Sequence, residues 1–240
     1  MPTDNPAARL HEILRRGKAI KKDVPCLGAW MTLLGTQNRE EVHARVGAVM
    51  GLPEAVKQAI ALHLPEDDIS DHWANVLNNA FTNQHMAGQW ASFIGQVDDT
   101  TIHFVGMIAK LLNREVSVQV LTDDKLAELA AGIEGLRSTV LEADLDRDTT
   151  RYLLRQLRRL KKAIDEYHIT GGEPILDSVE VVLGRVVCDP PFREKMKDKG
   201  QAIVEGLAIL ANAVTVATGM APLMLATAVP LMELIREAIP

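Results

Sequence analysis

Histidine and acidic side chains are the first candidates for chemistry, because together they could hold a metal ion. The tightest local group consists of Asp68, Asp71, His72 and His85. Asp68 and His72 are four residues apart and would share one helix face. No HExxH pair occurs, and the paired ExxH motifs of di-iron bundles are absent from the sequence. We therefore expect helix caps and surface side chains here rather than a metal site.

Nucleophiles and phosphate-binding loops are the next candidates, and the sequence holds neither in a familiar form. The patterns GxxxxGK[ST], GxGxxG and GxSxG do not occur. Of the two cysteines, Cys26 lies in an apolar stretch typical of a buried residue, and the role of Cys188 is undecided. We expect a non-enzymatic protein without catalytic residues or a cofactor. An enzyme of unfamiliar type is the alternative.

A basic segment could contact phosphate groups or anionic lipid. It carries six cations within twelve residues. The candidate anion contacts are its four arginines, Arg151, Arg155, Arg158 and Arg159. Acidic residues flank the segment on both sides, so a solvated face with internal ion pairs is the interpretation we prefer. Few aromatic residues interleave with the cations and the net charge is −6, so we do not expect nucleic-acid binding.

The most unusual segment runs from Gly206 to Met232, which is 27 consecutive residues without a charged side chain. An uncharged, mostly apolar run of about 18 residues or more is a candidate membrane span. Gly219 and Pro222 interrupt the run and predict a turn between two helices, at about 201–218 and 223–238. Each arm alone is short for a straight span, because a helix rises about 1.5 Å per residue and the bilayer core is about 30 Å thick.

Three interpretations of this apolar hairpin follow. Helices that are apolar on all sides belong in a core, so burial at the centre of a bundle is the first. The second is insertion into a membrane on demand, and here the hairpin is similar in architecture to the buried hairpin of pore-forming colicins. The third is self-association or partner binding through small residues. The residues assigned to the interaction or membrane segment are Gly206, Leu210, Ala213, Ala217, Gly219, Pro222, Leu225 and Ala228.

Length and composition fit an ordinary helical protein. The chain has 240 residues, of which 47% are hydrophobic and only 4% aromatic, and it is long enough to bury a core without disulfides. Two cysteines indicate a reducing compartment, and no secretory signal pattern opens the sequence. We expect a cytoplasmic protein that is membrane-associated if the hairpin inserts.

Apolar residues recur at a spacing of three and four in nearly every segment. This spacing predicts an all-α bundle of about nine to twelve helices that ends in the apolar hairpin. Thr36 predicts the cap of one helix ending at Gly51, and Pro53 predicts the start of another. Valines alternate with polar residues over 114–121, where we expect an extended connector or a helix continuation rather than a strand.

The domain organisation is predicted from helix length. Short helices occupy an N-terminal region at 1–120. Longer helices and the hairpin occupy a C-terminal region at 121–240. The boundary is soft, and one domain with a shared core is the alternative.

The middle of the chain combines a long leucine-striped helix, an Asp-rich break at 144–146 and a basic leucine-striped helix at about 148–167. The basic helix ends in Tyr167-x-Ile169-x-Gly171, and a short helix follows. This stretch, about 126–187, resembles a pattern in uncharacterised bacterial helical proteins. The resemblance implies a bacterial helical module and carries no activity with it.

Two classes of function agree with these features. The first, which we expect, is a non-enzymatic interaction or assembly protein that binds itself or another protein. The alternative is a membrane-acting effector that inserts its hairpin, residues 206–232, when triggered.

Overall fold

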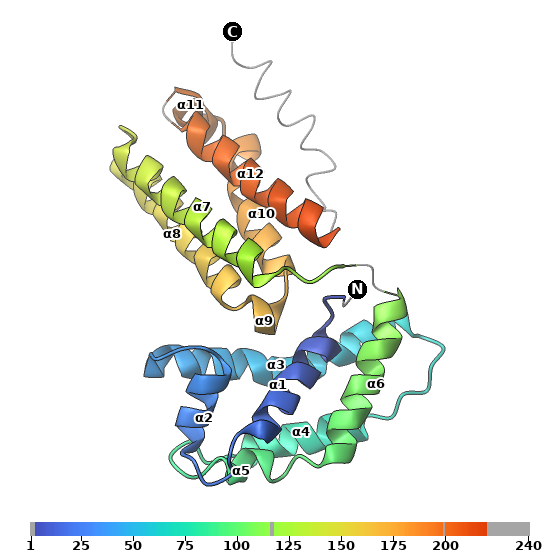
Figure 1. Ribbon diagram of the computed structural model, residues 1–240. Coiled ribbons are helices and arrows are strands. Elements are labelled where there is room, and N and C mark those ends of the chain that lie inside the picture. The colour runs from blue at the N-terminus through green and yellow to red at the C-terminus, as the bar shows by residue number, and fades with distance from the viewer. Residues whose placement is uncertain (1–2, 116–117, 199, 220–240) are drawn as a thin grey trace. The chain divides into compact units, whose positions relative to one another are not determined.

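The computed structural model describes residues 3–115, 118–198 and 200–219. Within these ranges the chain forms twelve α-helices, ten of them with at least seven residues, and no strand. The all-α class is therefore confirmed. The helices group into two compact units, of which the first comprises Met1–Ser117 together with His168–Gly171 (Figure 1). The second comprises Val118–Tyr167 and the chain from Gly172 onward.

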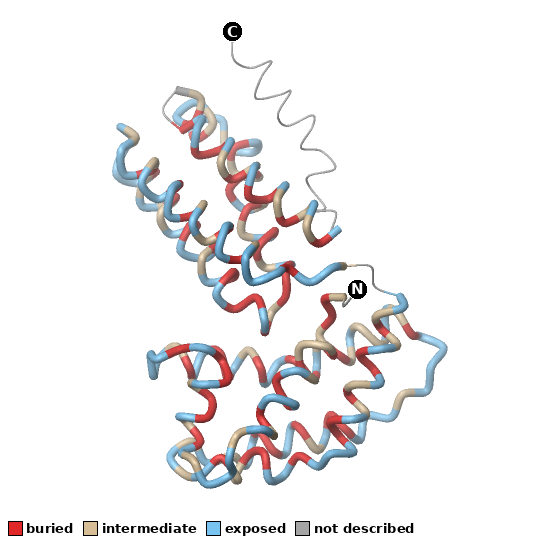
Figure 2. The backbone as a smooth tube through the Cα atoms, in the orientation of Figure 1, coloured by how far each residue is buried: buried red, intermediate tan, exposed pale blue. Residues whose placement is uncertain are grey.

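Unit 1 contains α1 (Pro6–Ala19), α2 (Cys26–Leu33), α3 (Arg39–His63), α4 (His72–Asn83), α5 (Ala91–Ile94) and α6 (Asp99–Glu115). Unit 2 contains α7 (Asp123–Glu142), α8 (Arg147–Asp165), α10 (Glu173–Cys188), α11 (Pro190–Asp198) and α12 (Gln201–Thr218). The short α9 (Tyr167–Thr170) begins with a residue of unit 2 and continues with residues of unit 1. Buried and exposed residues alternate along the helices of both units, and each unit has its own apolar core (Figure 2).

An aromatic cluster lies in the core of unit 1. The rings of Trp30, Phe81, Trp90 and Phe93 pack with centroids between 4.9 and 6.4 Å apart. The Trp90 Nε1–H donates a hydrogen bond of 2.9 Å to the carbonyl oxygen of Gly17, near the end of α1. A Cβ atom at Gly17 would lie 3.2 Å from the Trp90 ring. The glycine therefore lets α1 approach this indole closely.

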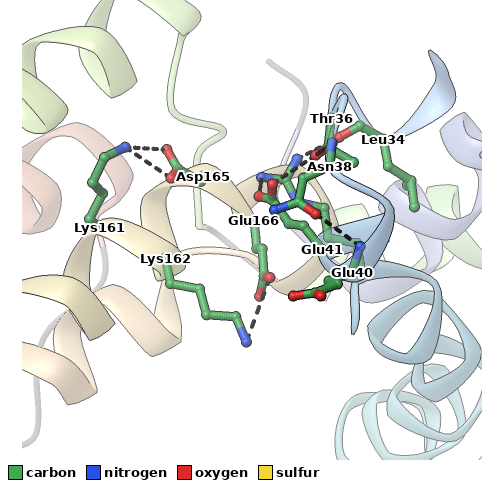
Figure 3. A network of polar contacts seen from close by, with 10 residues as sticks. Leu34, Thr36, Asn38, Glu40, Glu41, Lys161, Lys162, Asp165 and Glu166 are labelled. Carbon is green, nitrogen blue, oxygen red and sulfur yellow. Dashed lines mark hydrogen bonds and ion pairs between the residues drawn. The ribbon is translucent and has the colours of Figure 1, made fainter. Parts of the chain in front are cut away.

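The start of α3 differs from the expectation, because Thr36 is not its cap. Gly35, at φ +65°, ends α2, and the chain then makes a short turn in which Thr36 Oγ1 accepts from Asn38 N–H at 3.2 Å. Asn38 is the N-cap, and its side chain accepts from Glu40 N–H at 2.9 Å. The Thr36 hydroxyl instead donates to the Glu41 carboxylate at 2.7 Å, within the network drawn in Figure 3.

The predicted break at Gly51 and Pro53 is also wrong, since α3 continues through both residues. Proline inside a helix lacks an N–H donor and costs about 3 kcal/mol. The neighbouring apolar residues Val49, Leu52 and Val56 are between 0 and 4% exposed. Burial of this face in the core of unit 1 offsets the local cost, and the helix remains continuous.

The segment that joins α6 to α7 is an extended connector in its described part, as expected. The backbone N–H of Leu121 donates to the Tyr167 hydroxyl at 2.7 Å in a buried position. The backbone N–H of Gln119 donates to the carbonyl oxygen of Thr218, at the end of α12, at 2.7 Å. These two bonds tie the connector to unit 2.

Four helices of unit 2 form a closed bundle. Each contacts the next, α7 with α8, α8 with α10, α10 with α12, and α12 with α7 (Figure 1). The leucine stripe of α8 faces the interior, where Leu153, Leu157 and Leu160 are 1–3% exposed. The charged residues of α8 lie on its opposite face, so this helix separates the core from solvent.

The Trp90 hydrogen bond leads to a prediction for unit 1. The substitution Trp90→Phe removes the donor to Gly17 and leaves a void beside Trp30, so we expect it to lower the free energy of unfolding by about 2–3 kcal/mol. Urea unfolding followed by the fluorescence of Trp30 and Trp73 measures this change. Leu62→Ala is the control, because Leu62 is 73% exposed and its truncation should cost less than about 0.5 kcal/mol. Equal losses in both variants would contradict the assigned role of Trp90.

Candidate functional site

The apolar C-terminal segment begins as predicted, with helix α12 over Gln201–Thr218. One face of α12 belongs to the core of unit 2. Its buried residues are Ile203, Val204, Leu207, Leu210, Ala211, Val214 and Thr218. Leu210, a candidate residue of the sequence analysis, is 8% exposed. This face of the first arm is therefore part of the core of unit 2.

Two glycines bring α12 and α7 into close contact. A Cβ atom at Gly206 of α12 would overlap Leu136 Cδ2 of α7. A Cβ atom at Gly132 of α7 would lie only 2.8 Å from Leu210 Cδ2 of α12. In each helix, a glycine therefore makes room for a leucine side chain of the other helix. The order of the two contacts makes the helices antiparallel, because the later residue of α7 meets the earlier residue of α12.

The opposite face of α12 is exposed and mixes apolar with polar side chains, since Glu205 and Asn212 are exposed beside Ile209 and Val216. Ile209 is 68% exposed and Val216 is 76% exposed, and they lie two helical turns apart on the same side. Ala213 and Ala217 are half-buried and pack against the core of unit 2 at the edge of this face. The only charged residue of α12 is Glu205. We call the surface of Ile209 and Val216 the outer face of α12.

The predicted turn begins at Gly219, which ends α12 with φ +71°. Its backbone N–H donates to the carbonyl oxygen of Thr215 at 2.8 Å, as in a glycine-terminated helix. The remaining candidates Pro222, Leu225 and Ala228 lie outside the described residues, as does the second arm at 223–238. The hairpin itself therefore stays a prediction.

Among the described helices, α12 alone is long and apolar enough to cross a membrane, with a mean hydropathy of 1.4 over 18 residues. The core helix of a soluble protein satisfies the same criterion. Length and composition therefore do not separate a core role of α12 from a membrane role.

The four candidate arginines are all exposed on α8, and the structure divides them into two pairs. Arg151 and Arg155 line a pocket, whereas Arg158 and Arg159 do not. Arg158 Nε donates to the carbonyl oxygen of Leu154 at 3.3 Å, and an Arg159 terminal nitrogen donates to Gln156 at 3.4 Å. Further along the helix, ion pairs join Lys161 to Asp165 and Lys162 to Glu166 (Figure 3). The pocket described next therefore includes only the first pair of arginines.

The pocket has a volume of about 320 Å³ and lies between the first half of α8, the end of α10 and α11. Its lining consists of Asp148, Thr149, Arg151, Tyr152, Arg155, Arg185, Asp189, Pro191, Phe192 and Lys195. Four of these side chains are cationic and two are anionic. We call it the cationic pocket.

Two aromatic rings position the Arg185 guanidinium in the cationic pocket. Its Cζ atom lies 4.2 Å from the centroid of the Tyr152 ring and 4.5 Å from that of Phe192. Asp189 accepts from Arg185 Nε and from the Phe192 backbone N–H, each at 3.1 Å. The Phe192 N–H and, second, the Arg185 guanidinium lower the pKa of Asp189. These contacts therefore favour the ionised form of the Asp189 carboxyl.

Lys195 is held in a similar way by Asp146, the N-cap of α8. The two side chains form an ion pair of 2.8 Å, and Asp146 also accepts from the hydroxyl of Thr149 at 2.7 Å. The Lys195 ammonium, followed by Thr149, holds the pKa of Asp146 below its ordinary value. The pair fixes α11 against the start of α8.

The side chains that the sequence analysis considered for metal binding or nucleophilic chemistry do not line the cationic pocket. In the part of the chain that the structure describes, no three His, Cys, Asp or Glu side chains are grouped to hold a metal ion. Asp71 forms an ion pair of 2.8 Å with Lys57. Cys26 is buried, and burial raises the pKa of its thiol, whereas Cys188 is exposed. Neither cysteine lines the cationic pocket.

Sequence reasoning missed four residues of the cationic pocket. It did not connect Arg185, Tyr152, Phe192 or Lys195 with the arginines of α8. A spacing of three and four along α8 could have joined Tyr152 to Arg151 and Arg155. No local signal could have added residues from α10 and α11, because their proximity depends on the tertiary fold.

The chain matches no protein-family model, no curated protein and no solved structure. Its function must therefore be argued from its own residues. The resemblance of about 126–187 to bacterial helical proteins stays a prediction.

The glycine contacts of α12 lead to a prediction. Gly206→Ala adds a methyl group against Leu136, and we expect overpacking of about 1–3 kcal/mol to exceed the gain in helix propensity of about 1 kcal/mol. Gly135→Ala on α7 is the matched control, since a Cβ there meets no atom within 4 Å. We expect the control to raise the free energy of unfolding, measured in urea by circular dichroism. A stabilised Gly206→Ala variant would show that α7 and α12 are not in close contact.

Proposed function

We propose that the protein is a non-enzymatic assembly protein, and that the outer face of α12 contacts the same face of a second copy. The supporting observation is the exposure of Ile209 and Val216 beside a core that already uses the other side of the helix. Large exposed apolar side chains that share one helix face favour an interface, because their association removes apolar surface from water.

The surroundings of these two residues suit a helix-to-helix contact. Ala213 and Ala217 have small side chains at the edge of the face, so a second helix can approach closely. Glu205 is the only ionic side chain of α12, and it lies one turn before Ile209, where it can stay in contact with water at the rim. A two-fold arrangement would let each copy present the same residues to the other. Another protein with a similar apolar helix is the alternative partner.

A second candidate function is insertion into a membrane. It is favoured by the length and hydropathy of α12 and by the apolar residues that follow it in the sequence. Insertion would require α12 to leave the core of unit 2. This function therefore predicts a membrane effect that depends on a trigger, whereas assembly requires no rearrangement.

The outer face can be tested in the full-length chain. We expect the wild-type protein to self-associate, and Ile209→Lys combined with Val216→Lys to weaken this association by at least about tenfold, because two charges would be buried at the interface. Light scattering during gel filtration over a range of concentrations measures the effect, and circular dichroism checks that helix content is unchanged. Leu62→Lys on α3 is the control, since Leu62 is 73% exposed outside this face.

The same proteins separate the two candidate functions when they are mixed with dye-loaded anionic vesicles. Sealed vesicles and a concentration-dependent oligomer support assembly. Dye release that the double variant abolishes supports membrane insertion instead. A monomeric wild-type protein contradicts assembly, and vesicles that stay sealed at acidic as well as at neutral pH contradict insertion.

A further inference from the structure

The cationic pocket gathers positive charge from three helices that are separate in the sequence. Arg151 and Arg155 come from α8, Arg185 from α10 and Lys195 from α11. Like charges repel, so four cations around one hollow cost free energy unless something compensates them.

The carboxylates near the pocket compensate only part of this charge. Asp146 pairs with Lys195, and Asp189 engages Nε of Arg185. Asp148 lies 3.9 Å from Arg151, but its side chain is 90% exposed and the pair is weak. In the described part of the chain, Arg155 forms no ion pair, and its guanidinium instead lies 5.6 Å from the Tyr152 ring. Arginine donors therefore remain available inside the pocket.

One of these donors, Arg185, is held in place before any ligand arrives. Arg185 is stacked on Tyr152 and Phe192, and the edge-to-face contact of these two rings, at 5.4 Å, fixes α8 against α11. A guanidinium fixed by stacking and by its Nε bond presents its terminal nitrogens in one plane, as bidentate recognition of an oxyanion requires. Ordering Arg185 thus costs less entropy on binding than ordering a free side chain.

The arrangement does not suit a cationic ligand. Asp189 already accepts two hydrogen bonds, and Asp146 lies against Lys195. The volume of about 320 Å³ is at the small end of ligand pockets and fits a compact molecule. The rings of Tyr152 and Phe192 and the Pro191 side chain offer apolar surface for a short organic group.

We propose that the cationic pocket binds a phosphate monoester, with Arg151, Arg155 and Arg185 contacting its oxyanion. A monoester carries a charge near −2 at neutral pH and three acceptor oxygens, which matches a group of several cations better than a single carboxylate does. The ester can come from a free metabolite or from the headgroup of a lipid such as phosphatidic acid. The pocket does not include the outer face of α12, so this proposal is independent of the proposed assembly.

Two double variants of the full-length chain test the pocket with equal changes in charge on one helix. Arg151→Gln with Arg155→Gln removes the two α8 donors of the pocket, whereas Arg158→Gln with Arg159→Gln removes two exposed arginines outside it. We expect glycerol phosphate to bind the wild type, and the pocket variant to bind at least about tenfold more weakly, since each lost hydrogen bond is to a charged group. The control variant should bind within about twofold of the wild type.

Isothermal titration calorimetry with glycerol phosphate gives the affinity for a free ester, in buffer at about 150 mM salt so that diffuse attraction is screened. Co-sedimentation with phosphatidylcholine vesicles that contain phosphatidic acid gives the affinity for the lipid form. Circular dichroism of each variant confirms that the fold is intact.

Binding of glycerol phosphate that only the pocket variant loses supports the proposal and assigns a free ester. The same pattern with vesicles alone supports the proposal and assigns a lipid headgroup. Binding that both variants lose equally reflects the general charge of α8 and overturns the proposal. An absence of binding to both probes overturns it as well.

Discussion

The close contact between α7 and α12 is the constraint on which unit 2 depends. Leu136 lies against Gly206, and Leu210 lies against Gly132, so the two backbones approach at two points. This contact closes the four-helix bundle and places Val204, Leu207 and Val214 in the core. It also determines which side of α12 is left outside, because a helix that buries one face must present the other. With its other face packed in the bundle, α12 leaves Ile209 and Val216 exposed.

Helix α8 has a comparable double role, because its two faces serve the core and the cationic pocket. Its leucines hold α7 and α10 on one side. On the other side, Asp146 at its start holds Lys195, and Tyr152 holds Arg185. The packed leucine face holds the α8 backbone that carries Arg151 and Arg155, which line the pocket together with residues of α10 and α11. The pocket is thus positioned by the same helix that supports the bundle.

The sequence predicts those parts of the fold that depend on local interactions. The helices follow from the spacing of their apolar stripes, and the end of the first apolar arm follows from Gly219. The structure confirms both. The sequence does not predict the continuous α3, because the cost of Pro53 is offset by burial that only the folded core provides. It selects Gly206 for close packing but cannot name α7 as the partner helix. In the same way it selects Arg151 and Arg155 but not Arg185, whose proximity depends on how α10 packs on α8.

Assembly and membrane insertion differ in free-energy cost, because insertion would remove the buried face of α12 from the core. Each large apolar side chain in a core contributes about 1.5–3 kcal/mol, and α12 contributes Ile203, Val204, Leu207, Leu210 and Val214. Removing them together would cost as much as the whole stability of a typical domain, about 5–15 kcal/mol. A membrane would have to repay this cost before α12 could insert, whereas a second copy of the chain needs only the side chains that already face outward. The division of α12 into a buried face and an exposed face therefore favours assembly over insertion.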